Sequence, residues 1–175
     1  VRTVRTLRRW LTRQLGWRFP DAIIYPAGGG TGLIGMWIAF QELVAAGWAP
    51  GPPPRLYAVQ ATGCAPVVRA VVAGADRCEP WADPRTVASG LRVPAPLGGA
   101  LMLRAIRDTG GSAVAVSDDQ LVENARAVSS WEGVDVSPEG GAALSAAVAL
   151  RDAGRIDSEE RVVVFNTGAG WLYRG

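Results

Sequence analysis

The chain has 175 residues, of which 49% are hydrophobic, and a formal net charge of +2. These values are typical of one globular domain with a substantial core, and no apolar run is long enough to span a membrane. The absence of histidine excludes Ser–His and Cys–His nucleophilic catalysis, and two cysteines argue against a zinc site and a disulfide framework, so we expect a reducing, cytoplasmic location.

The N-terminal segment combines basic charge with regular apolar spacing. Its arginines are Arg2, Arg5, Arg8, Arg9, Arg13 and Arg18, with no acid among them. Val1, Val4, Leu7, Leu11 and Leu15 recur at helical spacing, and Gly16 is placed to end the helix. This pattern favours a helix with one basic face over a transit peptide or a nucleic-acid-binding arm, so no nucleic-acid partner is expected.

A glycine-rich turn then connects a strand predicted over residues 21–25 to a helix predicted over residues 31–46. The turn contains Gly28, Gly29, Gly30, Thr31 and Gly32. The first turn of a helix leaves backbone N–H groups unpaired, and the helix dipole places partial positive charge there. Glycines let this backbone wrap closely around an anion, so the turn predicts a phosphate site.

Three classes of phosphate ligand use such a turn. A P-loop requires lysine, which this sequence lacks entirely. A dinucleotide-binding Rossmann turn matches residues 30–35, but the next predicted strand, 55–60, ends in Gln60 and not in a carboxylate that could hold a ribose. The third class is a cup for the phosphate of pyridoxal 5'-phosphate (PLP), and the Rossmann domain remains the weaker alternative.

The rest of the chain alternates between helix and strand signals. Ser117 and Gln120 form a capping box that opens a helix, and Cys64 is expected to be a small buried residue at the start of one. Further helices are predicted over 66–73, 97–109, 117–131 and 139–153, and strands over 112–116, 134–136 and 161–165, the last of them buried on both faces.

This alternation predicts an α/β fold, an open and mostly parallel sheet with helices on both faces, forming a single domain over residues 1–175. Ligands of such sheets lie beyond the carboxyl ends of the strands. The glycine-rich turn lies at one such end and residues 166–170 at another, so one site can use both.

Six stretches, taken together and in this order, resemble the threonine synthases, PLP-dependent enzymes of the tryptophan-synthase-β-like fold type II. The resemblance spans about residues 7–173 and corresponds to the C-terminal portion of a family member. The stretches are Pro26–Trp37, Ala58–Gln60 with Gly63–Pro66, Val87–Pro94, Ala113–Asp119, Ser137–Gly140 and Phe165–Gly168.

The resemblance implies roles for named residues. Gly28, Gly29, Gly30, Thr31 and Gly32 would hold the PLP phosphate, and Thr167 would bond the pyridine nitrogen and leave it largely unprotonated. The alternative for Thr167 is a hydroxyl that satisfies a turn. Weaker candidates have structural alternatives: Ser137 and Glu139 as helix-capping residues, Arg92 as a surface ion-pair partner, and Trp37 and Trp81 as packing residues.

The family converts O-phosphohomoserine and water to threonine and phosphate in threonine biosynthesis, which implies a phosphorylated amino acid as substrate. Its Schiff-base lysine lies in an N-terminal part, and this sequence has no lysine, so no catalytic residue is assigned here. We therefore expect a portion that is inactive alone. The alternatives are half of a split enzyme with a separate N-terminal partner, a non-catalytic PLP- or phosphate-binding fragment, and a truncated remnant; a homo-oligomer also stays open.

Overall fold

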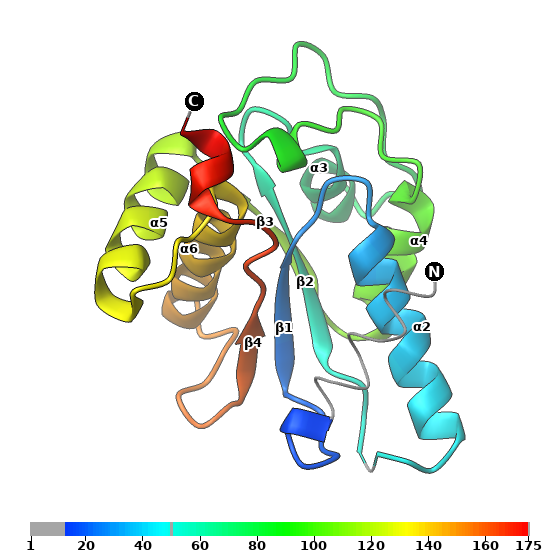
Figure 1. The fold of residues 1–175 in the computed structure, drawn as a ribbon. Coiled ribbons are helices and arrows are strands. Elements are labelled where there is room, and N and C mark those ends of the chain that lie inside the picture. The colour runs from blue at the N-terminus through cyan, green and yellow to red at the C-terminus, as the bar shows by residue number, and fades with distance from the viewer. Residues whose placement is uncertain (1–12, 50, 175) are drawn as a thin grey trace.

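The computed structural model describes residues 13–49 and 51–174 and contains one parallel sheet with strand order β3-β2-β1-β4. β1 pairs with both β2 and β4, and β2 with β3, all in parallel. This arrangement confirms the predicted fold class (Figure 1). The strands are β1 (Ala22–Pro26), β2 (Arg55–Ala61), β3 (Ser112–Val116) and β4 (Val162–Val164).

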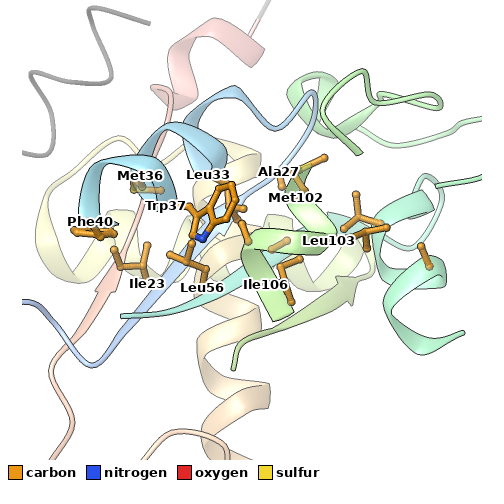
Figure 2. Packing of buried hydrophobic residues seen from close by; sticks show 14 of the residues in the cluster. Ile23, Ala27, Leu33, Met36, Trp37, Phe40, Leu56, Met102, Leu103 and Ile106 are labelled. Carbon is orange, nitrogen blue, oxygen red and sulfur yellow. The ribbon is translucent and has the colours of Figure 1, made fainter. Parts of the chain in front are cut away.

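Helices cover both faces of the sheet because successive strand residues point to opposite sides. Ile23, Leu56 and Ala58 pack with three helices on one face of the sheet, and Figure 2 shows part of this cluster. Ile24 and Tyr57 pack on the other side with the last two helices. The helices are α2 (Thr31–Ala45), α3 (Pro66–Val72) and α4 (Gly99–Asp108) on the first face, and α5 (Asp118–Glu132) and α6 (Pro138–Asp152) on the second.

Local signals set several helix ends. Ser117 accepts a hydrogen bond from the backbone N–H of Gln120 through its side chain, and the reciprocal bond is present, so the predicted capping box is confirmed. Gly133 ends α5 in the left-handed conformation at φ 65°, which glycine adopts without the Cβ clash of other residues. The described residues also form two short 3-10 helices. η1 (Ser89–Leu91) lies between α3 and α4, and η2 (Gly170–Tyr173) follows β4.

Two predicted strands differ from the structure. β4 was expected to be buried on both faces, but it lies at the edge of the sheet and its residues are half-buried. Residues 134–136 form no strand; Val136 makes a single bridge to Ala169. The helix expected over residues 1–15 falls largely outside the described residues, whereas Gly16 does take the left-handed conformation at φ 66°.

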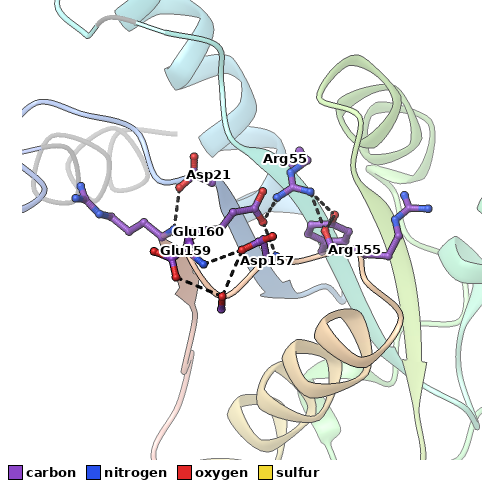
Figure 3. Close-up of polar contacts among 9 residues, drawn as sticks. Asp21, Arg55, Arg155, Asp157, Glu159 and Glu160 are labelled. Atoms are coloured by element: carbon purple, nitrogen blue, oxygen red, sulfur yellow. Dashed lines mark hydrogen bonds and ion pairs between the residues drawn. The ribbon is translucent and has the colours of Figure 1, made fainter.

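A polar network fastens the amino ends of the strands (Figure 3). Arg55, which opens β2, pairs with Glu160 and donates to the carbonyl oxygen of Arg155 at 2.8 Å. Asp21 accepts from the backbone N–H of Arg161, also at 2.8 Å. These contacts hold the bottom of β4 against β1 and β2, at the end of the sheet opposite the glycine-rich turn.

In the described part of the chain, no helix is both long and apolar enough to cross a membrane.

Candidate functional site

The glycine-rich turn leaves the sheet at the carboxyl end of β1. Ala27 donates to the carbonyl oxygen of Val59 at 2.8 Å, which holds the start of the turn against β2. Gly30 is the N-cap of α2 at φ 92° and makes no side-chain cap bond. The first helical hydrogen bond runs from Ile34 N to Gly30 O at 3.0 Å.

The backbone N–H groups of residues 29–33 find no acceptor within the described parts of the chain. The first turn of α2 contains no acidic residue, and Thr31 is exposed there. A helix of 15 residues carries partial positive charge at this end. The turn therefore presents several donors and a positive potential to an anion.

Two glycines of this turn approach other segments too closely for a side chain. A Cβ at Gly28 would lie 2.2 Å from the carbonyl oxygen of Gly90, and one at Gly30 would lie 2.6 Å from the sulfur of Met102. The turn is thus enclosed between η1 and α4, which fixes the backbone path that the donors follow.

Gln60, whose amide argued against a ribose site in the sequence, is a buried part of this framework. Its Nε2 donates to Ala27 O at 3.1 Å, and its Oε1 accepts from Val67 N at 2.8 Å. The side chain is fully buried. One amide therefore ties the entrance of the turn to the first turn of α3. A polar residue at the end of an otherwise apolar strand was the available signal.

The second predicted part of the site follows β4, the neighbour of β1. Phe165 N donates to Ile24 O at 3.1 Å, and the rings of Phe165 and Tyr25 lie 5.3 Å apart. Because the two strands are parallel and adjacent, the segments that follow them, with Thr167 in one and the glycine-rich turn in the other, start side by side.

The backbone around Thr167 is anchored on both sides. Asn166 Oδ1 accepts from the backbone N–H and the hydroxyl of Ser137, at 3.2 Å each, and Ala169 bridges to Val136. Thr167 itself is exposed, and no described residue bonds its hydroxyl. The structure thus gives this hydroxyl no role in satisfying a turn, and its assignment to a ligand stays a prediction.

Ser137 caps a helix, whereas Glu139 bonds to distant parts of the chain. Ser137 is the N-cap of α6 and accepts from Gly140 N at 3.2 Å, as its capping interpretation predicted. Glu139 is only 5% exposed, and its carboxylate reaches out of the helix to Gly90 N at 2.8 Å and to the hydroxyl of Tyr173.

Other candidates resolve into packing or solvent exposure. Trp37 lies in the core and Trp81 stacks on the guanidinium of Arg69 at 4.9 Å, so both are packing residues as expected. Arg92 is exposed and pairs with no acid among the described residues. Cys64 is fully buried, and this burial raises the pKa of its thiol, which confirms the structural role.

The assembled site can bind and orient an anion. The described residues contain no cluster able to hold a metal ion, and the sequence has neither histidine nor lysine. The glycine-rich turn and the Thr167 segment follow adjacent parallel strands at the same end of the sheet, and that they share one ligand stays a prediction.

The sequence is similar to known proteins over most of its length. A family model described as "Pyridoxal-phosphate dependent enzyme" matches residues 4–168. The threonine synthase of Methanocaldococcus jannaschii is 32% identical over 157 residues, which is 90% of this chain and 38% of that protein. The cysteate synthase of Methanoculleus marisnigri is 30% identical over 166 residues, 88% of this chain and 38% of that protein.

The fold is also similar to that of solved structures. A fungal L-serine ammonia-lyase from Rhizomucor miehei superimposes with a TM-score of 0.73 at 28% identity, covering 98% of this chain and 54% of that one. The chain thus spans about two fifths of the length of the curated relatives and about half of this solved structure.

Proposed function

The chain belongs to the family of pyridoxal-phosphate dependent enzymes, and from this premise we propose that it forms the cofactor-phosphate-binding part of a threonine-synthase-like enzyme. The complete enzyme would convert O-phosphohomoserine and water to threonine and phosphate. The observation that carries the proposal is the row of unpaired N–H groups over residues 29–33, at the strand end that adjoins Thr167. Residues 1–175 would act as one domain in this enzyme.

The residues present fit the cofactor at two points. Backbone N–H groups of the glycine-rich turn and the exposed hydroxyl of Thr31 would hold the phosphate. The exposed hydroxyl of Thr167 would bond the ring nitrogen, and because this group is neutral it would not favour a protonated ring. When bound, PLP supplies an electron sink for carbanions formed on the substrate.

A lysine that could form the Schiff base is absent from this sequence. In the family this lysine also acts as the base in proton transfer at the substrate carbon. We propose that a lysine-bearing segment or a separate polypeptide completes the site, and that this chain alone does not release phosphate from O-phosphohomoserine. A cytoplasmic location is part of the same proposal.

Related reactions are a second candidate for the same site. The cysteate synthase and the L-serine ammonia-lyase resemble this chain at 30% and 28% identity, close to the 32% of the threonine synthase. We retain threonine synthase as the first choice because the motifs from Pro26 to Gly168 follow its order. A non-catalytic PLP-binding module would share the phosphate cradle and lack turnover.

Titration of the purified chain with PLP, followed by borohydride reduction and intact mass, tests the cradle. We expect saturable binding and no reduced adduct on a side chain, since no lysine is present. Thr31→Asp should weaken PLP binding more than tenfold, because its carboxylate repels the phosphate. Thr31→Asn has the shape of Asp without the charge, and its PLP affinity should stay within a few-fold of wild type. An acidic residue in the first turn stabilises a helix, so unfolding would not explain the loss. Equal binding by both variants would contradict the proposal.

A further inference from the structure

One carboxylate oxygen of Glu139 accepts two hydrogen bonds from distant parts of the chain. Oε1 accepts from Gly90 N at 2.8 Å and from the hydroxyl of Tyr173. The hydroxyl of Ser89 adds a third contact, 3.3 Å from the Tyr173 hydroxyl. Glu139 is 5% exposed, so these bonds replace the water that its charge would otherwise require.

The Gly90 end of this network bears directly on the glycine-rich turn. Gly90 lies in η1, and its carbonyl oxygen occupies the place where a side chain at Gly28 would begin, 2.2 Å from an added Cβ. Gly90 is crowded from the other side as well, because a Cβ on it would lie 2.9 Å from Glu139 Oε1. Gly90 is therefore packed between Glu139 on one side and Gly28 on the other.

The Tyr173 end is held by a second carboxylate. Asp135 Oδ2 accepts from Trp171 N and from the guanidinium of Arg174, each at 2.8 Å, and Asp135 O accepts from Gly170 N at 3.1 Å. These bonds fix η2, the red turn beside the first turn of α6 in Figure 1. Thr167 lies between β4 and this fixed turn. Burial and the bond to Glu139 raise the pKa of Tyr173, so its hydroxyl stays protonated at neutral pH.

We propose that Glu139 and Tyr173 are positioning residues that latch η1 onto the start of the glycine-rich turn and thereby preorganise its N–H groups for the cofactor phosphate. This inference rests on the function proposed above. The same latch joins the turn to the segment that carries Thr167, so the two ends of the cofactor site are set by one buried carboxylate. Neither residue would touch the cofactor.

Three variants and one control test the latch. Tyr173→Phe removes one donor, and Glu139→Ala removes the acceptor for both bonds. Glu139→Gln keeps an amide oxygen that can accept from both groups, and it serves as the rescue. Leu172→Ala is the matched control, because Leu172 is 60% exposed on the same turn and its side chain takes no part in the latch. PLP affinity is measured by absorbance titration, and exchange of the Gly90 and residue 28–33 amides by NMR on the ligand-free chain.

Tyr173→Phe should raise the Kd for PLP about tenfold and accelerate exchange of the Gly90 amide about tenfold, the scale set by one hydrogen bond to a charged group. Leu172→Ala should match wild type in both measurements, and Glu139→Gln, which keeps both bonds without the charge, should lie between wild type and Glu139→Ala. Wild-type exchange and PLP affinity in Tyr173→Phe would overturn the latch, and this variant decides the matter even where Glu139→Ala fails to fold. Faster exchange in Tyr173→Phe with no PLP binding by wild type would uphold the latch and refute the proposed function.

Discussion

The side-chain amide of Gln60 donates to the backbone carbonyl of Ala27 at 3.1 Å, deep between β2 and the glycine-rich turn. Through this contact a strand residue fixes the start of the glycine-rich turn. The same amide accepts from α3, so the two elements that flank the carboxyl end of β2 share one buried polar group.

Gln60→Leu should lower the free energy of unfolding by about 2–4 kcal/mol, because the buried carbonyl of Ala27 and the N–H of Val67 each lose a partner. Denaturant unfolding measures this change. Gln41→Leu is the control, since Gln41 is exposed on α2, and it should stay within about 0.5 kcal/mol of wild type. If Gln60→Leu lowers the free energy of unfolding no more than the control does, the Gln60 amide does not stabilise the fold.

Thr167→Val should leave stability unchanged to within about 0.5 kcal/mol, because its exposed hydroxyl has no partner among the described residues. The same variant should weaken PLP binding, and Thr167→Ser should restore it. Thermal unfolding and PLP absorbance titration give the two readouts. A drop in stability without a loss of PLP affinity would assign the hydroxyl to the fold and not to the cofactor.

The two thiols should react slowly in the folded chain. Burial raises the pKa of both Cys64 and Cys78, so less thiolate is present at a given pH than for a free cysteine, and reactivity should rise only at higher pH. Cys64 is fully buried and Cys78 partly exposed, so iodoacetamide should label Cys78 first. Intact mass measures the labelling over time, with the denatured chain, which should take two labels, as control. Rapid labelling of Cys64 in the native protein would contradict its structural role.

Trp37 carries a buried indole N–H that no described residue accepts, and Figure 2 shows this nitrogen among apolar side chains. Trp37→Phe should therefore cost less than about 1.5 kcal/mol, since losing an unsatisfied donor offsets part of the lost volume. Trp37→Ala should cost about 3–5 kcal/mol through the cavity it leaves. Denaturant unfolding of the two variants separates these effects; similar losses would mean that the indole N–H is satisfied in solution.

Local features of this chain could be predicted from the sequence. The capping box at Ser117, the glycine stop at Gly133 and the strand-to-helix turn after β1 depend on neighbours within a few residues, and the structure has all three. The position of the turn and the Thr167 segment at the same end of the sheet could also be predicted, because the carboxyl ends of parallel strands lie together.

Features that depend on distant contacts could not be predicted. The edge position of β4 follows from strand order, and a short run of valines reads as buried on both faces whether or not a further strand covers it. Glu139 lies at a helix start, where an acid is ordinarily a dipole partner. Its bonds to Gly90 and Tyr173 span 49 and 34 residues, and no local pattern encodes them.

The most direct test of the cradle is a PLP titration of the isotope-labelled chain followed by ¹H–¹⁵N NMR. The account predicts that the largest shifts fall on the amides of residues 29–33, with a second group at Thr167. Shifts confined to the cavity of about 600 Å³ at the opposite end of the sheet, lined by Arg18 and Arg55 among others, would contradict it, as would the absence of any shift at residues 29–33.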